Sequence, residues 1–322
     1  MTIPYPVRLL CLSLACFYLV HLAVGLAVAL AAPRAMRWAE RSIARVAARR
    51  LAALRLLPAA LALFVVGGFC VPSYLWLEPR ATVEEVSLPC LAAAVLGLAI
   101  WAIPLARAVR GAARSLRHVR ECQRLGSLTR LAGESWPAWV IEGAAPCLAL
   151  AGFVRPRLVI SRGVLRALST EQLQAALRHE RAHWTSRDNL KRLLILAAPD
   201  VFPFCRAFAG LERGWARVTE WAADDRAVAG DSRRSISLAA ALVRVARLGG
   251  AWQPPPVTAT LLGSAGDLAA RVERLLRAAP ADEPPGRGMP VLAAGAVMAL
   301  AAAAMLPATL YSVHGLLERL VH

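Results

Sequence analysis

The stretch Leu9–Ala32, LLCLSLACFYLVHLAVGLAVALAA, contains no Asp, Glu, Lys or Arg. A helix of this length can cross the hydrocarbon core of a bilayer, because that core is about 30 Å thick and each residue adds about 1.5 Å. Three more stretches are similarly long and lack charged residues: Leu56–Leu77, Val86–Ala106 and Met289–Val313. The sequence therefore predicts a multi-pass α-helical membrane protein with transmembrane helices at about residues 9–32, 56–77, 86–106 and 289–313.

The composition of the 322-residue chain supports membrane insertion. Hydrophobic residues make up 58% of the chain and charged residues 18%, whereas a soluble globular protein has about 45–50% and about 25%. These values exclude a collagen, a disulfide-rich miniprotein and a disordered chain. The lipid bilayer is therefore an expected partner of this protein.

The net charge of +17 is compatible with nucleic-acid binding, so the location of the basic residues matters. Seven arginines follow the first apolar stretch, in the loop 33–55, and six follow the third, in residues 107–124. Such residues mark the cytoplasmic side of transmembrane helices. The pattern predicts that this loop and the region after Ala106 face the cytoplasm. It accounts for the charge without direct nucleic-acid binding.

Residues 107–288 hold most of the ionisable side chains and are predicted to form a cytoplasmic α+β domain, between the membrane parts 1–106 and 289–322. Branched residues at 139–141 and 148–161 predict short strands. Ser169 and Gln172 have the spacing of a capping box and predict a helix to about Trp184. Further helices are predicted at residues 206–229, 235–248 and 265–278, and a short, broken helix at 193–205, which contains prolines.

The predicted helix after Ser169 carries the sequence His179-Glu180-Arg181-Ala182-His183, an H-E-x-x-H pattern. Histidines four residues apart project from one helix face and can bind one Zn²⁺, while the intervening glutamate can act on a metal-bound water. For this composition, the expected number of chance occurrences is roughly 0.005. The pattern therefore predicts a zinc site on a helix.

A catalytic zinc needs a third protein ligand, and carboxylates are the candidates because no third histidine is near. Asp188 follows His183 by only five residues, so it is better placed to cap the next helix or to orient a ligand. Glu220 and Asp224 share one face of a separate helix, so one could bind the metal and the other an imidazole. A solvated acidic face is an equally good interpretation of that pair. The full set of candidates is Asp188, Glu212, Glu220, Asp224 and Asp225.

The pattern at 179–183, with Asp188 after it and Glu220-Trp221-Ala222-Ala223-Asp224 further on, reads H-E-x-x-H followed by E-x-x-x-D. This arrangement resembles the BlaR/MecR family of membrane-embedded antirepressor zinc metallopeptidases. Upstream, residues 151–153, 155–157 and 160–163 are similar to the family's lead-in to the zinc helix. The resemblance covers residues 146–276, and the order of three spans, peptidase domain and fourth span agrees with it.

The resemblance implies a gluzincin-like zinc peptidase domain. It implies that His179, His183 and Glu220 bind Zn²⁺, that Glu180 is the general base and that Asp224 supports the site, a role that Asp188 could share by orienting a ligand. It also implies that a strand on the edge of the sheet holds an extended substrate by strand addition. The residues of that edge strand would be Leu158, Val159, Ile160 and Ser161.

The family's antirepressors carry a large extracellular penicillin-binding sensor after the last span, whereas about nine residues follow Val313 here. The resemblance is therefore to a member without the C-terminal penicillin-binding sensor domain. We expect a zinc-dependent endopeptidase that cleaves a cytoplasmic protein substrate, with a transcriptional repressor in a signalling pathway as the candidate. Two alternatives stay open: a membrane-protein quality-control metalloprotease and a catalytically silent membrane scaffold. The sequence does not indicate the oligomeric state.

Overall fold

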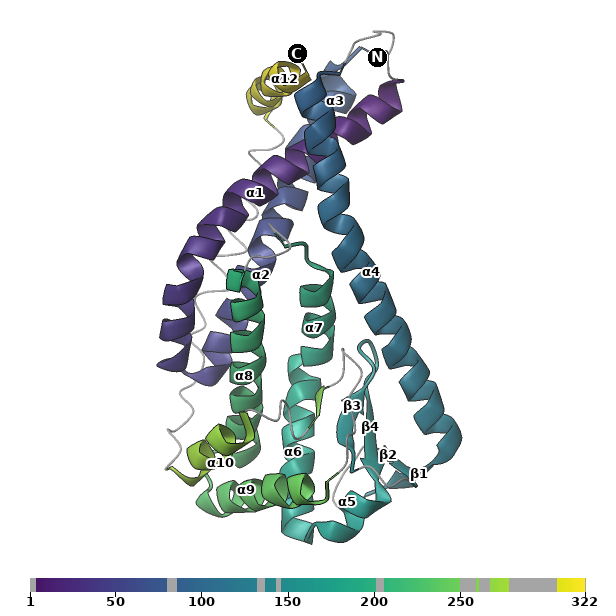
Figure 1. Ribbon diagram of the computed structural model, residues 1–322, viewed down its shortest axis with the longest axis vertical. Coiled ribbons are helices and arrows are strands. Elements are labelled where there is room, and N and C mark those ends of the chain that lie inside the picture. The colour runs from purple at the N-terminus through teal and green to yellow at the C-terminus, as the bar shows by residue number, and fades with distance from the viewer. Residues whose placement is uncertain are drawn as a thin grey trace.

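The computed structural model describes residues 4–79, 86–131, 137–142, 146–200, 206–249, 259–260, 267–277 and 306–321. Figure 1 shows long helices that meet near the two chain ends. Toward the opposite end of the molecule, α4 (Leu88–Leu125) diverges from the paired α1 (Tyr5–Glu40) and α2 (Ala44–Val65). Shorter helices and a small sheet fill the space between the separated ends.

Three helices are long and apolar enough, by length and composition, to cross a membrane: Tyr5–Glu40, Ala44–Leu77 and Leu88–Leu125. The first is α1. The second consists of α2 (Ala44–Val65), the π-helical turn η1 (Val66–Cys70) and α3 (Val71–Leu77), and the third is α4. They cover the first three predicted spans. Most of the fourth predicted span, 289–313, lies outside the described residues, and its last residues begin α12 (Pro307–Val321).

Helices α1 and α4 have 36 and 38 residues, whereas about 20 residues suffice to cross a bilayer. Each helix therefore extends well beyond any hydrocarbon core. The extension of α4 carries the six arginines of residues 107–124, and all six are exposed. Helix α4 thus continues from its apolar part to the sheet without a break, ending directly before the first strand.

The extended helices hold two helices of the second part between them. Helix α8 (Arg206–Val228) packs against α1 and α2, and α7 (Asp188–Ala197) packs against α4 and α2 (Figure 1). Buried apolar residues from α1, α2, α7 and α8 form one core, which includes Val28, Leu51, Ile195, Phe208 and Trp215. The helices able to cross a membrane and the helices near the H-E-x-x-H pattern are therefore one packed body rather than separate units.

The sheet has five described strands in the order β1-β2-β4-β3-β5. Strands β2 and β4 are parallel, and the other neighbours are antiparallel. The strands predicted near residues 139–141 and 148–161 are present as β2, β3 and β4, while β1 and β5 were not predicted. Their bounds are Gly126–Arg130 for β1, Pro137–Ile141 for β2, Leu148–Ala151 for β3, Arg157–Ser161 for β4 and Ala259–Thr260 for β5.

The prediction that Leu158, Val159, Ile160 and Ser161 form an edge strand is wrong. These residues are in β4, which pairs with β2 on one side and with β3 on the other. Val159, for example, lies opposite Trp139 of β2 and Ala149 of β3. A strand with two neighbours has no free backbone groups for a substrate strand. The continuous run of branched side chains reflects burial on both faces, which is the environment of an internal strand.

The remaining helices lie against the sheet and against one another. The capping box at Ser169 is present, and α6 runs from Thr170 to Ser186. The predicted helix at 193–205 begins earlier and ends at Ala197, before Pro199, while residues 201–205 lie outside the described residues. A second apolar core joins the sheet to α6 and α9. The other bounds are Arg162–Ala167 for α5, Ser232–Arg247 for α9 and Leu268–Leu276 for α10.

Candidate active site

Helix α6 supplies three of the side chains that the sequence analysis selected. His179 and His183 lie one turn apart, so both imidazoles project from the same face of the helix. Glu180 lies between them in sequence. All three side chains are buried, with 1% or less of their surface exposed. Polar side chains are rarely buried in such a group unless they bind one another or a ligand.

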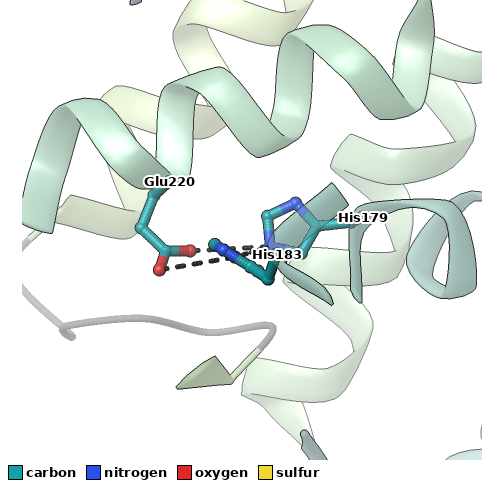
Figure 2. A group of neighbouring side chains, drawn as sticks. All are labelled: His179, His183 and Glu220. Carbon is teal, nitrogen blue, oxygen red and sulfur yellow. Dashed lines mark hydrogen bonds and ion pairs between the residues drawn. The ribbon is translucent and has the colours of Figure 1, made fainter. Parts of the chain in front are cut away.

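Helix α8 packs against α6 and brings Glu220 to the two imidazoles (Figure 2). Glu220 Oε2 lies 3.5 Å from His179 Nε2, and Glu220 Oε1 lies 3.7 Å from His183 Nε2. The two Nε2 atoms are 3.1 Å apart. The two Nε2 atoms and the carboxylate of Glu220 thus face a common point, although 37 residues or more separate Glu220 from the histidines in the sequence.

A carboxylate lies beside the second nitrogen of each imidazole. His183 Nδ1 donates to Asp188 Oδ2 at 2.9 Å, and His179 Nδ1 lies 2.9 Å from Asp224 Oδ1. A carboxylate at Nδ1 sets the ring orientation and leaves Nε2 available as a metal ligand. Asp188 can reach His183 because Arg187 adopts the left-handed conformation (φ 54°), which ends α6 and starts α7 immediately.

The other two carboxylates that the sequence left open as ligands lie elsewhere. Glu212 pairs with Arg55 of α2 at 2.9 Å, and Asp225 pairs with Arg274 of α10 at 2.6 Å. Neither belongs to the group formed by His179, His183 and Glu220, which is the group of possible metal-binding side chains found among the described residues. The fold therefore distinguishes Glu220 from its neighbours on the same helix.

Arg271, on α10, is a residue of the site that the sequence analysis missed. Its Nε and Nη2 donate to the two carboxylate oxygens of Asp224 at 2.9 and 2.7 Å, and its Nη1 lies 3.1 Å from Glu220 Oε2. The guanidinium is fully buried. It fixes the positions of the metal-facing carboxylate and of the aspartate behind His179. The spacing within α10 is that of an ordinary amphipathic helix, so no local pattern could have indicated this role.

The positive charges of the site lower the pKa values of two of its acids, Glu220 and Asp224. Burial would raise the pKa of Glu220, but the charges of His183 and Arg271 outweigh burial and hold this pKa well below its ordinary value. The pKa of Asp224 is lowered in the same way by Arg271 and His179. Both groups are therefore carboxylates at neutral pH, which is the form that binds a metal ion.

Glu180 differs from these two acids. Neither of its carboxylate oxygens has a hydrogen-bond partner among the described residues, although both are buried. Burial raises its pKa from 4.5 to about 7, and the charges of His179 and His183 offset only part of this effect. A carboxyl group with a pKa near 7 can both accept and release a proton under physiological conditions.

The three converging ligand atoms fit a metal ion. Ligands at about 2.0–2.1 Å from a tetrahedral ion are separated by about 3.3 Å, close to the 3.1, 3.5 and 3.7 Å between the Nε2 atoms and the Glu220 oxygens. Two histidines and one carboxylate leave a fourth position for water, as in catalytic sites. The buried, unpartnered oxygens of Glu180 nearby are also accounted for if a metal-bound water is present.

A cavity of about 490 Å³ opens beside His183. The turn between β3 and β4 forms one wall with Phe153 and Val154, and the junction of α6 and α7 forms another with Trp184 and Asp188. Asn189 fixes this junction to the sheet by donating to the carbonyl oxygens at the end of β3. His183 thus borders a partly apolar space large enough for several side chains, although only 1% of its own surface is exposed.

Two features define the class of protein to which the chain belongs. It has three helices able to cross a membrane, and it has a buried His-His-Glu group that could hold a metal. The sequence profile of the BlaR1 peptidase M56 family matches residues 79–275, more than half of the chain. The chain belongs to this family, which confirms the resemblance drawn from its motifs. The family consists of metallopeptidases. Together with the three helices able to cross a membrane, this identifies the chain as a membrane metallopeptidase. A comparison with curated proteins gives no match.

Proposed function

We propose that this protein is a multi-pass zinc endopeptidase of the bacterial inner membrane that cleaves a cytoplasmic protein substrate. The observation that carries the proposal is the convergence of His179, His183 and Glu220 beside the buried, unpartnered carboxylate of Glu180. Burying this many ionisable groups around one point costs free energy, which argues against a catalytically silent scaffold. Zinc is the metal that this ligand set most commonly binds in peptidases.

In the proposed mechanism, bound zinc would polarise the scissile carbonyl and lower the pKa of a water molecule. Glu180 would accept a proton from the attacking water and return it to the departing amine. Its pKa of about 7 suits both transfers. Asp188 and Asp224 hold the imidazoles in place, and Arg271 holds Glu220. The cavity beside His183 would receive the side chains of the substrate.

The orientation of the peptidase part follows from its basic surface. The exposed arginines of α4 and those of residues 34–50, where the structure has the end of α1 and the start of α2 rather than a long loop, lie on the side of the apolar helices that also carries α6 and α8. By the positive-inside rule this side faces the cytoplasm. A transcriptional repressor is the proposed substrate, because the family to which the chain belongs is described by its BlaR1 peptidase. The proposed role is therefore signal transduction by proteolysis.

The test uses the full-length protein and the variant Glu180→Gln. We expect this variant to retain its bound zinc, measured by elemental analysis, and to lose cleavage by a factor of about 10² to 10⁴. In cells, the variant should accumulate one uncleaved regulator, detected by comparing the proteomes of the two strains. Accumulation of many membrane proteins would instead support quality control. Unchanged cleavage by the variant, or absence of zinc from the wild-type protein, would overturn the proposal.

A further inference from the structure

A second cavity, of about 390 Å³, lies between α2, α8 and the junction of α6 and α7. It is separate from the space beside His183, although Thr185 and Asp188 border both. None of the metal-facing side chains lines this second cavity. Nothing in the proposed peptide cleavage uses it.

Basic side chains dominate the lining. Arg45 and Arg49 lie one turn apart on α2, and Lys191 and Arg226 face them from α7 and α8. Asp188 is the single acidic residue of the lining, and Lys191 and His183 both bind it. Like charges gathered around one cavity repel one another unless an anion neutralises them.

Two of these cations are available to a ligand. Arg226 is committed, because its Nη1 donates to Ala182 O, Thr185 Oγ1 and Ser186 Oγ. Arg45 and Arg49 are exposed, and neither has a hydrogen bond or an ion pair within the part of the chain that the structure describes. Two guanidinium groups on one helix face present several N–H donors in the fork geometry that matches phosphate oxygens.

An independent observation comes from Thr219 of α8. Its side chain lines the same cavity and is only 2% exposed, yet its hydroxyl oxygen has no hydrogen-bond partner among the described residues. A buried hydroxyl normally has a partner, because leaving it unbonded costs free energy. A ligand oxygen would satisfy it once the atoms that cover the hydroxyl move aside.

We propose that this cavity binds a phosphate group through Arg45, Arg49 and the hydroxyl of Thr219. The phosphate belongs either to the headgroup of an anionic lipid or to a soluble phosphate ester, since both present the same acceptor oxygens. The lipid is sterically accessible because Arg45 and Arg49 precede the apolar part of the candidate span Ala44–Leu77 by about two to three helical turns. The proposal is independent of zinc and of peptide cleavage.

The test compares the full-length wild-type protein with Arg45→Gln/Arg49→Gln and with Thr219→Val. In neutral detergent, the unfolding temperature is titrated with inorganic phosphate against chloride at equal ionic strength. In parallel, native mass spectrometry counts the phosphatidylglycerol retained from nanodiscs of phosphatidylcholine with or without that lipid. We expect the double variant to bind about tenfold more weakly and Thr219→Val to bind several-fold more weakly.

The control is Arg34→Gln/Arg37→Gln, which removes the same charge from exposed positions of α1 outside the cavity. It should bind like the wild type. Stabilisation by inorganic phosphate that the double variant loses indicates a soluble phosphate ester, and retention of phosphatidylglycerol alone indicates a lipid headgroup. Both outcomes support the site. An equal loss in the control, or no response of the wild type to either probe, would overturn the proposal.

Discussion

Helix α8 takes part in two ionic clusters, and in each of them a buried arginine lies between two carboxylates. At one end, Arg55 of α2 binds Asp200 at 2.8 Å and Glu212 of α8 at 2.9 Å. Further along α8, Arg271 binds Asp224 at 2.7 Å and lies 3.1 Å from Glu220. The residue types are the same, but only the second cluster faces two imidazoles.

The exposure of the carboxylates explains the difference. The side chains of Asp200 and Glu212 are 25% and 41% exposed, so water completes their hydration while Arg55 also binds two backbone carbonyls. Glu220 and Asp224 are 6% and 1% exposed, and their remaining acceptor capacity is directed to His179 and His183. An acid on α8 thus becomes a candidate metal ligand only where burial excludes water and an imidazole lies opposite.

The largest expected difference between the clusters concerns metal binding. Glu220→Ala should weaken zinc binding on the order of a thousandfold, because one of three protein ligands is lost. Glu212→Ala on the same helix should leave zinc binding unchanged. Competition with a fluorescent chelator measures both affinities. Full zinc occupancy in Glu220→Ala would show that Glu220 is not a zinc ligand and that the two clusters do not differ in metal binding.

The two arginines should differ in their contribution to stability. Arg271→Met leaves Asp224 and Glu220 buried without their cation, so the metal-free protein should lose about 3–5 kcal/mol. Arg55→Met should cost less, about 1–3 kcal/mol, because water can replace part of the interaction at its exposed carboxylates. Denaturant unfolding in detergent gives both values. Equal losses would contradict the role assigned to burial.

Glu180 belongs to neither cluster and should make stability depend on pH. Its pKa is raised from 4.5 to about 7 by burial, so the folded state keeps a proton that the unfolded state releases. In the metal-free protein, the stability from this proton is fully present below about pH 4.5 and is lost as the pH rises through about 7. The total is about 3 kcal/mol.

Unfolding temperatures measured from about pH 5 to about pH 8 test this dependence. Glu180→Gln should flatten the profile relative to the wild type, whereas Glu212→Gln, whose parent side chain is half-exposed, should not. An identical profile for Glu180→Gln and the wild type would mean that the buried carboxyl group titrates normally.

The smallest expected effect concerns the aspartates that hold the imidazoles. Asp188→Asn and Asp224→Asn keep the shape of the side chain but weaken its hold on Nδ1, so zinc affinity should fall about 10–100-fold. Asp200→Asn in the Arg55 cluster should leave zinc affinity unchanged. The chelator competition measures all three. A fall in Asp200→Asn as large as in the other two would show that the clusters are coupled.

Local patterns predicted the helix that carries the histidines, because a capping box and a four-residue spacing are properties of a single helix. They also predicted the three apolar helices, since length and lack of charge suffice for that inference. The prediction of an edge strand was wrong because the neighbours of a strand depend on the topology of the whole sheet. A run such as Leu158–Ile160 indicates burial but does not indicate which strands lie beside it.

The sequence by itself determined the apolar helices, the metal-binding pattern on α6 and the family to which the chain belongs. Only the tertiary structure decided which acid faces the imidazoles, since Glu212, Glu220 and Asp225 are all acidic residues of one helix. It also brought Arg271 to Glu220 and gathered Arg45, Arg49 and Thr219 around one cavity. The physical reason is that burial and charge pairing arise between elements distant in sequence, where no local spacing records them.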